Sequence, residues 1–94
     1  MRAEDICTFD AGERRKSMAS AMIVRTVQKS ASEVTLEAGG KSCDASQFLE
    51  MLALPFLPGA PVHIVAEGSD ADAVVKAIAR LLRPAPETVM PRAS

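Results

Sequence analysis

The chain has 94 residues, of which 48% are apolar, 24% charged and 3% aromatic, and its net charge is −1. This length and composition predict one globular domain with a modest aliphatic core. The balanced charge gives no general attraction to nucleic acid or membranes. We expect a cytoplasmic protein, because no apolar run reaches the roughly 20 residues of a transmembrane helix and the N-terminus has no signal-peptide pattern.

The first 29 residues predict a strand followed by a helix. The stretch EDICTF, residues 4–9, is rich in strand formers. We expect DAGERRK, residues 10–16, to be a loop and Ser17 to be a helix N-cap, because its hydroxyl can accept a backbone N–H. Met18 and Met22 widen the apolar face of this helix, where we expect them to pack in the core. The other apolar positions at helical spacing are Ala19, Ile23, Val24 and Val27.

A hairpin and a short helix follow. In SEVTLEAGGKSCDA, residues 32–45, apolar and polar residues alternate up to a Gly39–Gly40 turn, and a short return strand follows it. SQFLEMLALP, residues 46–55, predicts a helix with Ser46 as a possible cap and Pro55 as its end. This helix is so apolar that we expect it to be buried or part of an interface. Its apolar residues are Phe48, Leu49, Met51, Leu52 and Leu54.

The last strand and helix occupy residues 62–83. Alternation in residues 62–66 predicts that Val62, Ile64 and Ala66 face the core and that His63 faces away. GSDADAVVKAIARLLR, residues 68–83, is an amphipathic helix capped by Ser69 or Asp70. The domain is thus predicted to span residues 1–83. Residues 84–94 contain three prolines and no periodicity, and we expect a disordered tail.

The residue types needed for catalysis or metal binding are scarce. Cys7 and Cys43 match no zinc spacing and are too few for a disulfide framework, so we interpret them as small buried apolar residues. His63 is the single histidine of the chain. We find no acid–base pair, no nucleophile beside a histidine and no glycine-rich phosphate loop. The sequence therefore predicts no enzyme, no metal site and no cofactor.

The predicted order βαββαβα indicates an α+β fold with a four-stranded antiparallel sheet and three helices on one face. Periodicity alone leaves two such folds open, the ferredoxin-like plait and the open-faced β-sandwich of phosphocarrier proteins.

Two stretches of the chain resemble HPr, the histidine-containing phosphocarrier protein of the sugar phosphotransferase system. They are SEVTLEAGGKSCDA and FLEMLALPFLPGAPVHIVAEGSDADAVVKAIARLL. The resemblance covers roughly residues 4–83, keeps the Gly-Gly-Lys turn and the Ala-Glu-Gly strand end without a gap, and implies the open-faced β-sandwich. In the same register, Lys16 takes the position of the phosphorylated histidine, and Met18 and Ala19 take those of the arginine and proline of the His-x-Arg-Pro motif.

These departures from the motif remove the chemistry that the resemblance would imply. Neutral imidazole offers a lone pair near neutral pH, whereas a lysine amine, with an ordinary pKa of about 10.4, stays protonated. Met18 cannot hold a phosphoryl oxygen as arginine would. Many HPr proteins also carry a regulatory serine at the start of the second helix. The register places Gln47 there, and a shift of one residue would place Ser46.

The basic run Arg14, Arg15 and Lys16 has two interpretations, a docking patch for a phosphate or an acidic partner, and a solvated charged loop. The resemblance favours a partner-binding surface formed by Arg14, Arg15, Lys16, Ser17, Gln47, Phe48 and Met51. We therefore predict a non-phosphorylatable HPr-like protein that acts as a regulatory or interaction module on a protein partner, such as a phosphotransferase-type enzyme or a regulator. The alternatives are a phosphocarrier-type protein with another acceptor, Ser17 being the nearest hydroxyl, and a structural homodimer.

Overall fold

The computed structural model describes residues 1–9, 13–55 and 59–83, and in the first helix it describes side chains from Lys16 onward. The predicted order of elements is confirmed. The predicted tail, residues 84–94, lies outside the described residues. The elements are β1 (Arg2–Thr8), α1 (Glu13–Gln28), β2 (Ser32–Ala38), β3 (Lys41–Asp44), α2 (Phe48–Ala53), β4 (Pro61–Gly68) and α3 (Ala71–Leu82).

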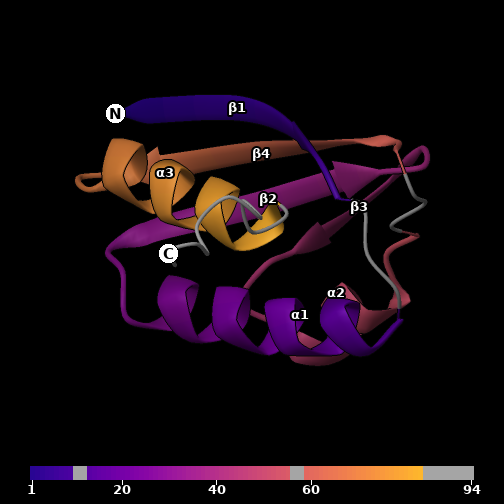
Figure 1. Ribbon diagram of the computed structural model, residues 1–94. Helices are drawn as coiled ribbons and strands as arrows, with labels where there is room; N and C mark the ends of the chain where they lie inside the picture. Colours follow the sequence, from indigo (N-terminus) through magenta and orange to yellow (C-terminus); the bar gives the residue numbers. More distant parts are fainter. Residues whose placement is uncertain (10–12, 56–58, 84–94) are drawn as a thin grey trace, which may run out of the picture.

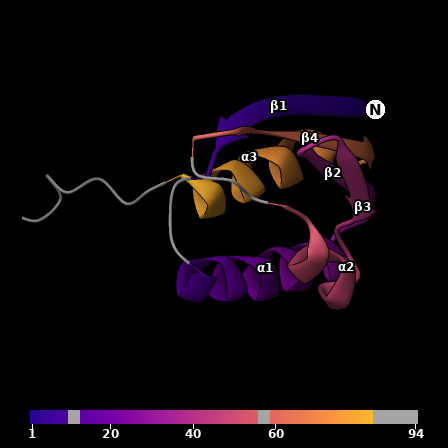
Figure 2. The same ribbon diagram turned by 90° about the vertical axis from the view of Figure 1, so that its right-hand side faces the viewer.

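The four strands form one sheet in the order β1-β4-β2-β3, and neighbouring strands are antiparallel. Strand β1 lies at an edge and pairs with β4 alone. A ferredoxin-like plait would place the first strand in the interior of the sheet, so this order decides between the two folds. The three helices lie on one face of the sheet (Figure 1; Figure 2), which makes the fold the predicted open-faced β-sandwich.

The core lies between the helices and the inner face of the sheet. Along β2 and β4 every second residue is buried, because successive side chains of a strand point to opposite faces. The outer face of β2 carries polar residues instead. Helix α3 adds its apolar stripe to the same core. The buried residues of these three elements include Val34, Leu36, Ala38, Val62, Ile64, Ala66, Val74, Val75, Ile78 and Leu82.

The turn between β2 and β3 depends on glycine. Gly39 and Gly40 have φ angles of 58° and 79°, which other residues rarely adopt. A Cβ on Gly39 would also lie 2.7 Å from Cγ of Pro55, the second residue after the end of α2. The glycine thus allows the hairpin tip to approach the end of α2.

The start of α1 differs from the prediction. The helix begins at Glu13, so residues 13–16 are helical rather than a loop, and Ser17 lies inside the helix rather than at its N-cap. Glutamate, arginine and lysine are good helix formers, and they extend the helix by one turn before Ser17.

The two methionines of α1 do not pack in the core. Met18 is 63% exposed and Met22 is 52% exposed. The buried side of the helix is already occupied by Ala19, Ile23 and Val27. At about 100° per residue, Met18 and Met22 lie about 140° and about 100° around the helix from Ile23, the middle of that side. The predicted core role of Met18 and Met22 was therefore wrong.

The two predicted caps also take other roles. Gln47 is the N-cap residue of α2, and Ser46 instead donates its hydroxyl to Asp44 Oδ1 over 2.8 Å. Asp70 is the N-cap residue of α3, but its side chain makes no cap hydrogen bond. Its carboxylate accepts the Ala31 N–H at 3.0 Å and the Ser32 hydroxyl, and so ties the start of α3 to the start of β2.

Candidate functional site

Helices α1 and α2 pack together beneath the sheet (Figure 1). The side-chain amide of Gln28, the last residue of α1, donates to the Ser46 carbonyl over 3.1 Å. This contact places the beginning of α2, with Gln47 and Phe48, beside the end of α1.

The predicted partner-binding residues therefore fall into two groups. Lys16 precedes Gln28 by twelve positions, so the two lie about 18 Å apart along the helix at 1.5 Å per residue. Lys16 and Ser17 form one group and Gln47 and Phe48 the other. Ser17 and Gln28 are about three turns apart and thus project from the same side of α1. Ser17 thus lies on the Gln28 side of α1, about three turns from that residue, and the predicted residues do not form one cluster.

Exposed apolar side chains lie on the same two helices. Met18 and Met22 are exposed on α1, and Phe48 and Leu49 are 40% and 78% exposed on α2. We use "α1–α2 surface" for Ser17, Met18, Met22, Gln47, Phe48 and Leu49. Sequence reasoning missed Met18, Met22 and Leu49 as surface residues. Their angular distance from Ile23 and Met51, about 100–160° at 100° per residue, would have indicated it.

Met51, in contrast, is not accessible to a partner. Its side chain is fully buried at 0% exposure, and its Sδ lies 3.6 Å from Cys43 Sγ. The burial of Met51 removes it from the predicted partner-binding residues. It supports the α1–α2 surface from beneath.

The basic start of α1 is described only in part. Arg14 and Arg15 lie in the first turn of α1, and their side chains are outside the described residues. Lys16 is half-buried, and it has an interaction partner, so it is not a free cation. A docking patch formed by these three residues stays a prediction.

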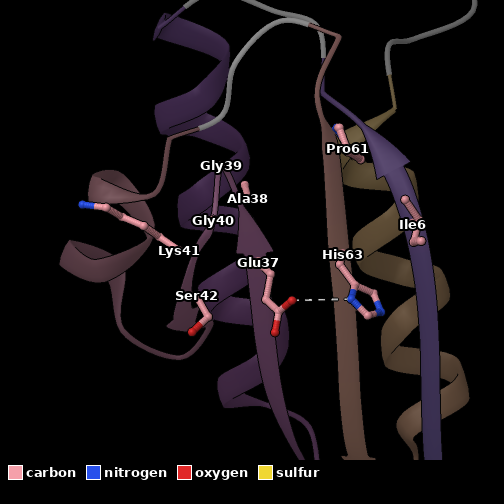
Figure 3. A pocket seen from close by; sticks show the side chains of 9 residues that line it. All are labelled: Ile6, Glu37, Ala38, Gly39, Gly40, Lys41, Ser42, Pro61 and His63. Atoms are coloured by element: carbon pink, nitrogen blue, oxygen red, sulfur yellow. Dashed lines mark ion pairs between the residues drawn. The ribbon is translucent and has the colours of Figure 1, made fainter.

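The histidine lies on the other side of the sheet. His63 faces the outer surface of β4, as predicted, between carboxylates of the two neighbouring strands. Its Nε2 lies 2.8 Å from Glu4 Oε1. Its Nδ1 lies 3.6 Å from Glu37 Oε1, the contact drawn in Figure 3. The hydrogen bond from His63 is the largest cause that lowers the pKa of the Glu4 carboxyl, and Arg2 adds to it.

A hollow of about 440 Å³ opens on this face beside His63 and the Gly39–Gly40 turn (Figure 3). Glu4 and Glu37 take opposite nitrogens of the imidazole ring. Among the described residues, no three His, Cys, Asp or Glu side chains are placed to hold a metal ion.

The cysteines have the predicted character. Both are free thiols and both are buried. Burial raises the pKa of Cys43 to about 11 and also raises the pKa of Cys7, so both thiols stay protonated near neutral pH. None of the helices in the described ranges has the length and apolar character needed to cross a membrane.

Comparison with known proteins identifies the family. A family model described as the HPr component phosphorylation site of the phosphotransferase system matches residues 16–83. The chain belongs to the HPr family. The match begins at Lys16 and covers most of the sequence, which confirms the resemblance to HPr.

Two solved structures show the same fold. The phosphocarrier protein HPr from Bacillus anthracis str. Ames has a TM-score of 0.77 and 20% identity, over 87% of this chain and 98% of that one. HPr-C-His from Thermoanaerobacter tengcongensis has a TM-score of 0.69 and 23% identity, over 87% of this chain and 90% of that one. At these identities the likeness shows the fold alone.

Proposed function

We propose that this HPr-family protein carries no phosphoryl group on a histidine and acts by binding a protein partner in the cytoplasm. One observation carries the proposal. The single histidine of the chain, His63, lies on the outer face of the sheet. Helix α1 lies on the inner face (Figure 2). The first helix, where the family motif expects the histidine, has Lys16 instead.

Neither Lys16 nor His63 is a suitable phosphoryl acceptor. A lysine amine is protonated near neutral pH and has no lone pair to attack phosphorus. His63 has an imidazole, but carboxylates of Glu4 and Glu37 lie 2.8 Å and 3.6 Å from its two nitrogens. An incoming phosphoryl donor is itself anionic, and these carboxylates would repel it.

The α1–α2 surface supports a binding role. Four apolar side chains are exposed there, Met18, Met22, Phe48 and Leu49. Full burial of one such side chain contributes about 1.5–3 kcal/mol. A protein partner that covers the two helices would gain this free energy, and the polar Ser17 and Gln47 would lie at the rim of the contact. The phosphotransferase-type partners of HPr proteins, or regulators that bind them, fit this description.

The test is binding of the purified chain to the phosphotransferase enzyme that charges HPr, measured by isothermal titration calorimetry. Leu49→Glu should weaken binding by about tenfold or more, because it places a charge in the apolar contact. Ala73→Glu, an equal charge change at an exposed position of α3, is the matched control and should bind within about twofold of the wild type. Equal binding by both variants would contradict the proposed surface. Binding of no partner, together with a dimer that Leu49→Glu dissociates in sedimentation, would favour the structural homodimer.

The basic start of α1 has a separate test. If Arg14, Arg15 and Lys16 contribute, replacing all three with alanine should weaken the same binding at low salt. The difference should shrink as the Debye length falls from about 10 Å at 0.1 M to about 3 Å at 1 M. Unchanged binding of the triple variant at low salt would place the whole contact on the apolar residues.

A further inference from the structure

The free edge of β1 is a second surface, remote from the two helices α1 and α2. Within the described residues β1 pairs on one side only. The Met1 carbonyl accepts the Gly68 N–H at 2.9 Å, so Met1 turns its backbone toward β4. In an antiparallel pair, the backbone N–H and C=O groups of successive residues point alternately toward the paired strand and away from it. The backbone groups of Arg2, Glu4, Ile6 and Thr8 therefore point away from β4.

The contact of Ile6 agrees with this alternation. Its backbone N–H does not point to β4 but donates to Asp5 Oδ1 over 2.8 Å. A neighbouring side chain thus covers the middle donor of the edge. The Ile6 side chain itself is 63% exposed on the outer face.

A basic groove runs beside this edge, between β1 and α3. The two elements pack together (Figure 1; Figure 2), and the groove has a volume of about 170 Å³. It is lined by three cations and one carboxylate. These residues are Lys76, Arg80, Arg83 and Asp5, with Ala79 at the base.

The charges of the groove are not balanced within the described residues. Asp5 Oδ2 lies 3.8 Å from Arg83, and Asp72, outside the groove, lies 3.2 Å from Lys76. Both contacts are between exposed groups and therefore weak. Arg80 has no ion-pair partner in the described ranges 1–9, 13–55 and 59–83. Counted over the described residues, three cations face the carboxylates of Asp5 and Asp72, so the groove keeps a net positive charge beside the edge of β1.

We propose that the free edge of β1 binds an extended acidic segment of a partner protein as a fifth strand. Its backbone would hydrogen-bond to Arg2, Glu4, Ile6 and Thr8, as in other cases of strand addition. Alternate side chains of an added strand point to opposite faces of the sheet. The side chains of the added strand that point to the inner face enter the basic groove, and these are acidic. On the outer face, one side chain of the added strand lies beside Ile6, and this one is apolar or β-branched.

Asp5 has a defined part in this proposal. In the unbound protein the Asp5 carboxylate accepts the Ile6 N–H and lies 3.8 Å from Arg83 of the groove. These contacts protect the edge from nonspecific strand pairing. A carbonyl of the added strand replaces Asp5 at the Ile6 N–H, and a carboxylate of the added strand enters beside Arg80. Asp5 is therefore a competitor of the ligand. The proposal does not depend on the function of the α1–α2 surface.

The test begins with the wild-type chain and a synthetic peptide, acetyl-ETEVETE-amide, followed by backbone amide NMR. We expect saturable shifts confined to β1 and α3, and loss of binding when each Glu of the peptide is replaced with Lys. Binding should weaken as salt rises. Shifts in α1 and α2 instead, equal binding of the Lys peptide, or no saturable shift at millimolar peptide would overturn the proposal.

Three variants and one control variant locate the contact. Arg80→Glu should weaken peptide binding by about tenfold, and Lys29→Glu, the same charge change at the end of α1, should change it by less than about twofold. Ile6→Pro removes the outward N–H without touching the bonds to β4, and should also abolish binding. Asp5→Ala should tighten binding several-fold, since the competitor is gone. Equal effects of Arg80→Glu and Lys29→Glu, or an Asp5→Ala variant that binds no tighter, would contradict the pairing described here.

Discussion

Replacement of Ser20 with alanine should stabilise the protein. Ser20 lies on α1 with 0% exposure, and its hydroxyl oxygen has no hydrogen-bond partner among the described residues. It is the one buried side chain in the described part of the chain for which a polar atom is left unpaired. In the unfolded chain the same hydroxyl is bonded to water, so folding takes it out of water without compensation.

The magnitude follows from two contributions. An unpaired buried hydroxyl costs about 1–3 kcal/mol. Alanine is also a better helix former than serine, by about 0.5 kcal/mol. Removal of the oxygen atom also removes its van der Waals attraction to the surrounding atoms, which offsets part of this gain. We expect Ser20→Ala to raise the free energy of unfolding by about 1–2 kcal/mol. For a domain of this size, each kcal/mol raises Tm by about 4–8 °C.

Ser30→Ala is the matched control, because it makes the same chemical change where the hydroxyl is satisfied. Ser30 Oγ donates to the Val27 carbonyl over 2.7 Å and accepts the Ser32 N–H at 3.2 Å. Its loss should destabilise the protein by about 1–2 kcal/mol. Urea denaturation of the wild type and both variants gives the free energies of unfolding. A Ser20→Ala variant that is less stable than the wild type would show that the hydroxyl has a partner and would refute this reasoning.

Two further predictions concern titrating groups. Hydrogen bonds from Ser32 and Ala31 lower the pKa of Asp70 below its ordinary value of 3.8, so its stabilising effect is present above that value and is lost as pH falls through the lower, folded-state pKa. Asp70→Asn should accordingly unfold with a shallower dependence on acid pH in circular dichroism titrations, and an unchanged acid limb would contradict the Asp70–Ser32 contact. With a pKa of about 11 in a buried site, Cys43 should react with iodoacetamide at pH 8 much more slowly in the folded protein than in urea, and equal rates by mass spectrometry would contradict its burial.

The sheet could be predicted from the sequence because its alternation is strict. Val34, Leu36 and Ala38 alternate with polar residues, and the Gly39–Gly40 pair fixes the turn, so the hairpin follows from local chemistry. The position of β1 at the edge does not follow from its own residues. It required the resemblance to HPr, because periodicity does not report which strands pair.

The surface of the helices was less predictable. The apolar character of Met18 and Met22 predicts a core position, yet the helical angle to Ile23 and Val27 turns them outward. Met51 is predicted to take part in partner binding, yet its side chain is buried and its Sδ lies 3.6 Å from Cys43 Sγ. Asp70 is expected to cap its own helix, but a carboxylate at that point is also within reach of the start of β2, which no local pattern reports.

The central claim, that this HPr-family chain carries no phosphoryl group on histidine, is tested most directly by phosphoryl transfer. The chain is incubated with phosphoenolpyruvate and the phosphotransferase enzyme that charges HPr, beside an HPr that retains the histidine, and both are examined by intact mass before and after mild acid. We expect the control to gain one acid-labile phosphoryl group and this chain to gain none. Lys16→His should restore little, because Met18 and Ala19 also depart from the motif. Acid-labile phosphate on the wild-type chain would contradict the account, and acid-stable phosphate on Ser17 would favour the alternative acceptor.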